Sequence, residues 1–437
     1  VTSTGGGGGY CGRALAAGDL NAGGKADRAV GAIYAAGNAG RAYFFYSQNG
    51  QVSTNRNIAG EAATDNFTYA LTTGEWNADG RADLAVGAYG YSSETGRVYI
   101  FYGDGQVPTT AATADIIMTG NAAGDRFGWA LTSGDYNADG RVDIAVGAPV
   151  YSTSTGRTYV FYGGSIITEG ASGADVTITG ETTSNNFGTS LVSGDFNADS
   201  KTDIAVAGSG YDTPATDTGR AYIFYSGAIT TENASGADVT INGENSGNFG
   251  VTMIAGDFNG SGTTDLVVSG YGSGSTGRLY LFSNDTSYPS GGSTADVLIV
   301  GENSGDFMVA TGAGDFNADG KIDIAAGSSA YSSNTGRAYV FYADGTNNFG
   351  TATCSGSSPS VCSATDADIK INGETTSNEF ATAIAADMNA DGRTDVVVAA
   401  YRYGSYGGLV YIFFDGGSLP TTASSADVIL GGDVGAG

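Results

Sequence analysis

The sequence contains no histidine, and this absence excludes several kinds of active site. A Ser-His-Asp or Cys-His nucleophile, an imidazole general base and a histidine-ligated metal all require that side chain. Basic residues are scarce too, with 18 Lys and Arg against 45 Asp and Glu, which gives a formal charge of −27. Because binding to phosphates needs clustered cations, we expect no nucleic-acid partner. Sites built from oxygen ligands for hard cations remain compatible with this composition.

Long apolar runs are also lacking. The longest, VVVAAY from Val396 and LVYIFF from Leu409, are strand-sized, whereas a membrane-spanning helix needs about 18 or more apolar residues. We therefore expect no membrane span. The chain begins at Val1 without a charged and apolar leader, which is typical of a mature form.

Cysteine is rare, with three residues, too few for a disulfide scaffold. Cys354 and Cys362 are eight positions apart in a Ser- and Gly-rich stretch. We predict a local disulfide between them, which implies an oxidising compartment; two surface thiols are the alternative. Cys11 stands where other units carry Phe, so we expect a buried small apolar side chain there.

What the chain does contain is a repeat. The segment DYNADGRVDIAVGA, from Asp135 to Ala148, recurs seven times with variation. Successive copies start 56 to 62 residues apart, except the last, which follows after 72 because an insertion at about residues 344–366 contains the cysteine pair. A fixed period of this length indicates a repeat architecture.

Each unit holds four apolar runs of strand length. In the fourth unit they begin at Phe187, Asp203, Gly219 and Ala237. The third run alternates with a period of two and has large residues on both faces, which indicates a strand covered on both sides. We predict an all-β fold, a seven-bladed β-propeller of four-stranded antiparallel blades over residues 10–437. A long β-solenoid is the alternative, but its coils are usually shorter than these units.

The order of motifs within a unit resembles a known repeat. An FG pair (Phe127-Gly128, Phe187-Gly188, Phe249-Gly250) is followed by D-F-N-A-D-G-x-x-D, then V-G-A-P at Val146 to Pro149, then G-R-x-Y-x-F-Y. This order resembles the FG-GAP repeat of the integrin alpha-subunit β-propeller, and the seven copies match the seven blades of that family. The resemblance implies the fold more strongly than a function, since related repeats occur in adhesion receptors, secreted bacterial proteins and appendages of enzymes.

The Asp-rich loops follow a calcium-binding pattern. In the third copy Asp135, Asn137 and Asp139 stand at positions 1, 3 and 5, Gly140 permits a sharp turn at position 6, and Asp143 at position 9 can close the shell. The residue at position 7 can add its backbone carbonyl. Hard oxygen ligands favour calcium over zinc or copper. The alternative is an Asx-turn hairpin in which these side chains only cap backbone amides.

We predict up to seven Ca²⁺ sites, which would stabilise the fold rather than catalyse a reaction. The pattern is complete in the third, sixth and seventh copies; Ser200 replaces Gly in the fourth, Glu75 replaces the first Asp in the second, and Gly23 and Ser261 replace the central acid in the first and fifth. The predicted ligands are Asp19, Asn21, Asp27, Glu75, Asn77, Asp79, Asp83, Asp135, Asn137, Asp139, Asp143, Asp195, Asn197, Asp199, Asp203, Asp257, Asn259, Ser261, Asp265, Asp315, Asn317, Asp319, Asp323, Asp387, Asn389, Asp391 and Asp395.

Two recurrent residue types receive structural interpretations. Six arginines that follow glycine are expected to pair with acids of the G-E segments rather than to form a ligand-facing ring. Most of the 26 tyrosines are expected in core and blade-to-blade packing rather than in a stacking platform for sugars. The arginines are Arg41, Arg97, Arg157, Arg220, Arg278 and Arg337, and the acids are Glu61, Glu181, Glu244, Glu302 and Glu374.

The sequence favours a secreted or cell-surface protein that is not an enzyme, a calcium-stabilised extracellular adhesion, binding or assembly module. Its partner would be a protein or glycan ligand at the cell surface, or copies of itself in a homopolymer. A subunit of an extracellular filament or surface layer is the first alternative, and a polysaccharide-active propeller enzyme is the second. The loops in which the units differ, Tyr211–Thr218, Asn284–Ser293 and Asp344–Asp366, are expected at the blade tops, where they would carry specificity. The Gly-rich arm, residues 1–9, has no assigned place in the ring and can pack on its own ring or on a neighbouring molecule.

Overall fold

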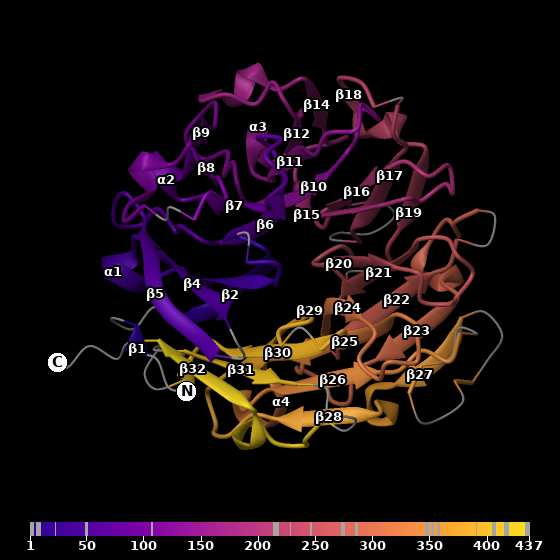
Figure 1. Cartoon of the computed structure of the whole chain (residues 1–437). Coiled ribbons are helices and arrows are strands. Elements are labelled where there is room, and N and C mark those ends of the chain that lie inside the picture. The colour runs from indigo at the N-terminus through magenta and orange to yellow at the C-terminus, as the bar shows by residue number, and fades with distance from the viewer. Residues whose placement is uncertain are drawn as a thin grey trace.

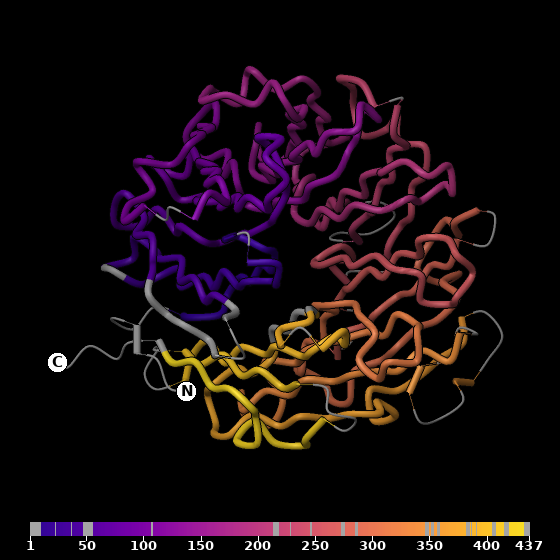
Figure 2. The backbone as a smooth tube through the Cα atoms, viewed as in Figure 1, coloured from indigo at the N-terminus to yellow at the C-terminus, as the bar shows by residue number. Residues whose placement is uncertain are grey.

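The computed structural model shows seven β-sheets arranged as blades around a central axis (Figure 1). The structure describes residues 4–5, 10–21, 23–48, 51–105, 108–212, 218–227, 229–244, 247–271, 276–284, 287–345, 349–350, 354–355, 359–389, 391–403, 408–414 and 419–432. The backbone trace shows the first blade, in indigo, beside the last blade, in yellow, so the ring closes between them (Figure 2). The predicted seven-bladed all-β propeller is confirmed.

Each blade contains four antiparallel strands in sequence order, and the first strand of each blade contacts the first strands of its neighbours around the axis. Blade 1 contains β2 (Cys11–Gly18), β3 (Asp27–Ala32), β4 (Arg41–Gln48) and β5 (Gln51–Ala59). Blade 2 contains β6 (Ala70–Gly74), β7 (Asp83–Ala88), β8 (Arg97–Phe101) and β9 (Ile116–Thr119). Blade 3 contains β10 (Ala130–Gly134), β11 (Asp143–Ala148), β12 (Arg157–Phe161) and β14 (Val176–Thr179).

The remaining four blades repeat this plan. Blade 4 contains β15 (Phe187–Gly194), β16 (Asp203–Gly208), β17 (Arg220–Phe224) and β19 (Val239–Asn242). Blade 5 contains β20 (Met253–Gly256), β21 (Asp265–Gly270), β22 (Arg278–Phe282) and β23 (Val297–Val300). Blade 6 contains β24 (Val309–Gly314), β25 (Asp323–Ser328), β26 (Arg337–Phe341) and β28 (Ile369–Asn372). Blade 7 contains β29 (Phe380–Ala386), β30 (Asp395–Ala400), β31 (Leu409–Phe413) and β32 (Val428–Gly432).

Short helical turns occupy the connections. In the described residues, four α-helices of four residues follow the second strand of blades 1, 2, 3 and 6: α1 (Ala35–Asn38), α2 (Tyr91–Glu94), α3 (Tyr151–Ser154) and α4 (Tyr331–Asn334). Single 3₁₀ turns precede the outer strand of blades 2 to 7: Ala111–Thr113, Ala171–Gly173, Ala234–Gly236, Gly292–Thr294, Ala364–Asp366 and Ala423–Ser425. Within the part of the chain that the structure describes, no helix has the length and apolarity to cross a membrane.

The hydrophobic core lies between blades. One cluster combines Val98 and Ile100 of blade 2 with Val146 and Phe161 of blade 3, and each other interface repeats the pattern. The second and third strands are buried on both faces because a neighbouring blade covers each face. The FG phenylalanine belongs to this core: the rings of Phe127 and Tyr159 pack edge to face at 5.4 Å. The central tyrosine of the third strand is buried in blades 2 to 7, as predicted, whereas Tyr43 of blade 1 is half-buried.

The repeated arginines hold neighbouring blades together. Four of the six form ion pairs with the glutamate of the preceding unit, and all eight side chains are largely shielded from water. The pairs are Arg97–Glu61 at 2.7 Å, Arg220–Glu181 at 2.7 Å, Arg278–Glu244 at 2.6 Å and Arg337–Glu302 at 2.8 Å. For these four the predicted pairing is confirmed. Arg157 differs because the preceding unit has Asn121 in place of the acid. Among the described residues it keeps only the Nε bond to the outer strand, to Thr179, which Arg97 also makes to Thr119.

A short parallel pairing joins the outer edge of each blade to the next blade. In each case, the segment just before the outer strand of one blade pairs with the outer strand of the blade before it. Three of these segments are strands, β13 (Glu169–Gly170), β18 (Glu232–Asn233) and β27 (Ser360–Ser363), paired with β9, β14 and β23. Three are single bridges, Ala59↔Thr110, Asn242↔Gly291 and Asn372↔Thr422. We call this pairing the inter-blade latch.

The N-terminal arm supplies the seventh latch. In blade 1, β4 and β5 pair as far as Gln48↔Gln51, so only residues 49–50 lie between them and no latch segment fits there. Instead β1 (Thr4–Gly5) pairs in parallel with β32 of blade 7, and Thr4 opposes Gly431. Gly431 in β32 is equivalent to Thr179 in β14 of blade 3. Thr179 opposes Asn233 in the latch of blade 3. Of the two placements considered for the arm, the structure has Thr4–Gly5 on its own ring.

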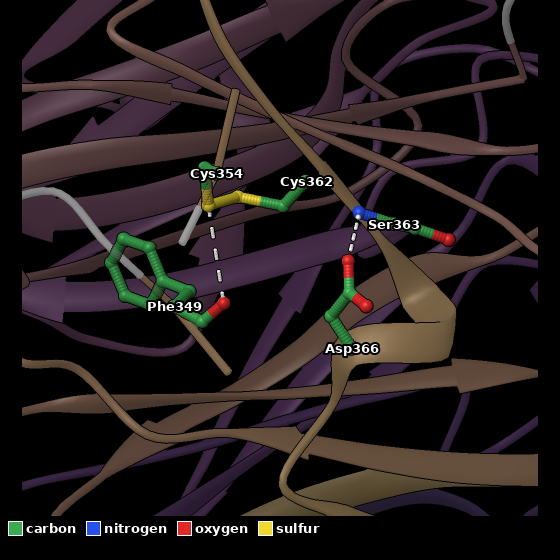
Figure 3. Close-up of a disulfide and its surroundings, with 5 residues drawn as sticks. All are labelled: Phe349, Cys354, Cys362, Ser363 and Asp366. Carbon is green, nitrogen blue, oxygen red and sulfur yellow. Dashed lines mark hydrogen bonds between the residues drawn. A yellow bond between two sulfur atoms is a disulfide. The ribbon is translucent and has the colours of Figure 1, made fainter. Parts of the chain in front are cut away.

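A disulfide joins Cys354 and Cys362 beside the latch strand β27 (Figure 3). The two Cα atoms are 4.6 Å apart. Ser363, next to Cys362, is the N-cap of the following 3₁₀ turn, and its side chain and that of Asp366 form a capping box. Within the insertion, residues 346–348, 351–353 and 356–358 lie outside the described part. The disulfide therefore anchors the start of the insertion to the segment that latches blade 5.

The three variable loops do not share one end of the ring, contrary to the expectation. Connections alternate between the two ends of an antiparallel sheet, so loops after the second strand lie opposite to loops after the first and third strands. The segment 211–218, described only at its ends, follows a second strand. The described parts of Asn284–Ser293 and of the insertion follow third strands and lie at the Asp-loop end, where the backbone amide of Asn284 donates to Asp265 Oδ1 at 2.8 Å.

Candidate functional site

The Asp-rich loops connect the first and second strands of every blade, so all seven lie at one end of the ring. In the third loop the Asp139 amide donates to Asp135 Oδ1 at 3.0 Å and to Asn137 Oδ1 at 2.9 Å. The Gly140 amide donates to Asp135 Oδ2 at 2.8 Å. The sixth and seventh loops repeat these bonds. Asp135 Oδ1 and Asn137 Oδ1 both accept from the Asp139 amide, so these two oxygens lie next to each other at the turn.

The aspartate at position 9 is buried and accepts two backbone hydrogen bonds. Asp143 Oδ2 accepts from Tyr136 N and Oδ1 accepts from Gly163 N, both at 2.7 Å. This side chain thereby ties the loop to the end of the third strand. Burial raises the pKa of Asp143 to about 6, although the two amides oppose the rise. The same cause raises the pKa of Asp323 to about 7.

These loops fit a hard cation in donor chemistry. Each offers carboxylate and amide oxygens, and a carboxylate oxygen that accepts one amide hydrogen bond keeps a second lone pair. The positions of the side chains do not yet form a metal site: in the described ranges, no three Asp, Glu, Cys or His side chains lie close enough together to hold a metal ion. Their oxygens instead bind loop amides, as in the Asx-turn alternative. Calcium binding by these residues stays a prediction.

A cavity of about 600 Å³ opens at the opposite end of the ring. Its lining residues either begin a first strand or follow a second strand, in blades 1, 5, 6 and 7. They are Tyr10, Arg13, Ile33, Tyr34, Val251, Thr252, Tyr271, Phe307, Val309, Thr311, Gly327, Ser329, Ala381, Tyr401 and Arg402. We call it the axial cavity, because the ends of the innermost strands line it.

Aromatic side chains gather at this end. Tyr10 packs on Tyr34 and Tyr401, with ring centroids 4.7 and 5.7 Å apart, and Tyr271 packs on Phe307 at 5.1 Å. Beside the cavity, a further group consists of Tyr69, Tyr89 and Trp129, with centroids 4.5 to 4.8 Å apart. All eight rings keep contact with solvent.

Two of these aromatic residues have left-handed backbone. Tyr10 and Phe307 both have φ 52°. They directly precede Cys11 and Met308, which take the place of the FG phenylalanine in blades 1 and 6, and Phe307 exposes 39% of its surface. The other blades place Asn66, Arg126, Asn186, Asn248 and Glu379 there, all with positive φ. The left-handed residue is therefore a feature of the repeat, and what distinguishes blades 1 and 6 is that this residue is aromatic.

The charges at the cavity are unevenly compensated. Arg402 forms an ion pair with Glu379 at 2.5 Å, and Arg126, beside Trp129, pairs with Glu94 at 3.0 Å. Arg13 lies over the Tyr69 ring at 4.8 Å and donates to the Tyr69 hydroxyl at 3.3 Å. Among the described residues no carboxylate lies within ion-pair distance of Arg13. The axial cavity therefore carries a net positive charge in a strongly acidic protein.

Sequence reasoning missed this site. The sequence predicts that most tyrosines serve in packing. The tyrosines at the axial cavity pack on one another but are only half-buried. A signal was present in the repeats: the second residue after the FG phenylalanine varies among Tyr69, Trp129 and Thr189, whereas the phenylalanine itself stays the same in these units. The residue after the second strand varies in the same way, between Tyr89, Pro149, Ser209 and Tyr271.

Comparison with known proteins agrees with this architecture. The fold alone defines the class, a seven-bladed β-propeller. The profile of the FG-GAP repeat matches residues 67–101, 127–161, 187–224, 307–341 and 381–413. These stretches lie in blades 2, 3, 4, 6 and 7, the blades whose loops have an acid at position 5. Five of the seven blades thus contain FG-GAP repeats, and part of the chain is similar to integrin alpha subunits.

The curated relatives share only part of their length with this chain. Bovine phosphatidylinositol-glycan-specific phospholipase D is 38% identical over 151 residues, which are 32% of this chain and 18% of the relative. Integrin alpha-PS2 of Drosophila melanogaster is 39% identical over 118 residues, 24% of this chain and 8% of the relative. Mouse integrin alpha-IIb is 36% identical over 116 residues, 24% of this chain and 11% of the relative. The chain thus spans less than a fifth of each of these three proteins.

Proposed function

We propose that this propeller is a calcium-stabilised extracellular binding module, without enzymatic activity, that takes its ligand in the axial cavity. The proposal rests on the different chemistry of the two ends of the ring. One end holds the Asp-rich loops, and the other holds an aromatic cavity with a positive charge. A volume of about 600 Å³ lies within the range of roughly 300–1,000 Å³ of small-ligand sites.

The residues around the cavity support binding rather than catalysis. None of the described lining residues is Asp, Glu or Cys, so they provide no carboxylate general acid or base and no thiol nucleophile. Burial raises the pKa of Tyr271, which keeps its phenol neutral near neutral pH. The matched phospholipase shares only a repeat-bearing segment with this chain, so its activity is not carried over.

Calcium would be held by the Asp-rich loops, most completely in blades 3, 6 and 7. It would supply positive charge between carboxylates that otherwise repel one another. The disulfide and the integrin relatives support an extracellular or cell-surface location.

The test is a binding measurement with site variants. Calorimetric titration with a panel of neutral and acidic oligosaccharides should show binding that Tyr271→Ala removes. Tyr102→Ala, a half-buried tyrosine at the Asp-loop end, is the matched control and should retain binding. Binding unchanged in both Tyr271→Ala and Tyr401→Ala would place the ligand elsewhere and overturn the proposal. Release of shorter sugars during incubation would favour the polysaccharide-active enzyme instead.

A filament or surface-layer subunit is the second candidate, favoured by the seventh latch. Thr4–Gly5 pairs with β32 through backbone atoms, so the same arm could occupy blade 7 of a neighbouring copy. Arms exchanged in this way from chain to chain would form an open polymer. Electron microscopy of the native material distinguishes filaments from discrete rings.

A further inference from the structure

We propose that the ligand of the axial cavity is an acidic saccharide, bound through a sugar carboxylate to Arg13 and through sugar ring faces to the surrounding aromatic side chains. This inference rests on the proposed function and specifies the ligand class of the same site.

The charge argument comes from Arg13. The other two arginines at this end are compensated by Glu379 and Glu94, whereas the described residues place no carboxylate against Arg13. A guanidinium has five N–H donors in a planar fork that matches a carboxylate, and its described hydrogen bond uses one group, toward Tyr69. A ligand carboxylate would complete this arrangement.

The same charge argues against a cationic ligand. A cage of aromatic rings in an acidic protein could attract an ammonium ion, but a cation in this cavity would meet the Arg13 guanidinium. Like charges at close range repel at the effective dielectric near a protein surface, whereas a ligand anion would be attracted to the same guanidinium. An anionic group therefore fits the cavity better.

The lining favours a sugar as the carrier of that group. Two aromatic pairs line the cavity, Tyr10 with Tyr401 in blades 1 and 7, and Tyr271 with Phe307 in blades 5 and 6. Thr252, Thr311 and Ser329 also line the cavity. The Thr252 hydroxyl donates to the Ala310 carbonyl and the Thr311 hydroxyl to the Ala325 carbonyl, and each oxygen can still accept a hydrogen bond. A pyranose ring offers apolar C–H faces for the rings and hydroxyls for these groups, whereas a short acidic peptide offers few flat apolar faces.

The experiment compares three probes of matched length. A tetramer of galacturonic acid is expected to bind at least tenfold more tightly than a neutral galactose tetramer or a tetraglutamate peptide, measured by calorimetry at fixed ionic strength and saturating calcium. Arg13→Gln should weaken the affinity for the acidic tetramer at least tenfold and leave the affinity for the neutral tetramer unchanged. Arg13→Lys should restore part of the lost affinity. Arg56→Gln is the matched control, because Arg56 is exposed at the Asp-loop end and binds the Gly105 carbonyl.

The outcomes separate this inference from the proposed function. Equal binding of the acidic and neutral tetramers, with no effect of Arg13→Gln but a loss in Tyr271→Ala, overturns the acidic ligand and keeps the site. Tighter binding of the peptide than of either sugar overturns the saccharide. Binding of the acidic tetramer that neither Arg13→Gln nor Tyr271→Ala changes overturns the site itself. Thermal melts of each variant in calcium show that the ring is intact.

Discussion

Blade 1 and blade 3 have the same four strands but differ at three positions that most other units keep. Blade 3 has Phe127 in the core, a complete Asp loop and an aliphatic residue, Ile144, after the position-9 aspartate. Blade 1 has Cys11, Gly23 and Arg28 at these positions. The difference teaches that a repeat unit at the seam, where the ring closes, is under different constraints from units inside it.

Arg28 shows the difference most clearly. Its side chain is 3% exposed and donates to Met388 Sδ of blade 7 at 2.7 Å. Burial lowers the pKa of Arg28 to about 10, although Asp395 and Asp27 oppose the fall. The guanidinium thus places a fixed positive charge beside two position-9 aspartates, in the blade whose loop lacks the central acid. We infer that loop 1 depends less on a bound cation than loop 3 does.

Calcium removal should have the largest effect, and it tests this contrast directly. Each occupied site adds about 2.7 kcal/mol when free calcium is 100 times its Kd, so excess EGTA should lower the Tm substantially. Asp135→Ala and Asp19→Ala form a matched pair, because each aspartate accepts two loop amides. Asp135→Ala should cost more stability in calcium, and the two should be equal in EGTA. An unchanged Tm in EGTA contradicts calcium binding.

Core truncation should have the next largest effect. Phe127→Ala should cost about 3–5 kcal/mol, because it leaves a cavity against Tyr159 and Phe161. Cys11→Ala should cost about 1 kcal/mol, because only one buried heavy atom is lost. Chemical denaturation in saturating calcium measures both. Equal losses would mean that the seam is packed as tightly as the interior of the ring.

The pH dependence of the calcium-free protein should follow the position-9 aspartates. Their pKa rises from 3.8 to about 6 in Asp83, Asp143 and Asp203 because burial disfavours the carboxylate. The folded state therefore takes up protons, so stability is highest below pH 4 for these groups and falls as the pH rises through 6. Thermal melts in EGTA between pH 4 and 7 should show this fall, and Asp143→Asn should reduce it. A Tm that rises over this range would contradict the assignment.

Removal of residues 1–9 should have the smallest effect. The described arm contributes the backbone pairing of Thr4–Gly5 with β32, and each hydrogen bond adds about 0.5–1.5 kcal/mol. If the arm serves its own ring, the deletion lowers the Tm by a few degrees and leaves the molar mass in light scattering unchanged. If arms are exchanged between copies, the deletion instead abolishes the larger species.

The sequence alone determined the number of blades, the strands and the loops with calcium-type ligands. These features follow from local pattern and from a period that recurs seven times, so each copy supports the others. The fourth unit illustrates this: β15, β16, β17 and β19 lie within the four runs identified there. Arginine–glutamate pairing between units could be predicted as well, because both partners recur with the repeat.

Only the tertiary structure decided three features: the placement of the N-terminal arm, the ends at which the variable loops lie, and the axial cavity. These features depend on residues outside the repeat or on the alternation of loops between the two ends of the ring. The pairing of Thr4 with Gly431 has no local signal, because a backbone latch needs no particular side chain. The variable loops looked alike in sequence, yet they separate because loops after second and third strands point to opposite ends. The axial cavity joins Tyr10 and Arg13 to Tyr271, Phe307 and Tyr401 from distant blades. Ring closure brings them together, since residues around an axis are neighbours in space whatever their separation along the chain.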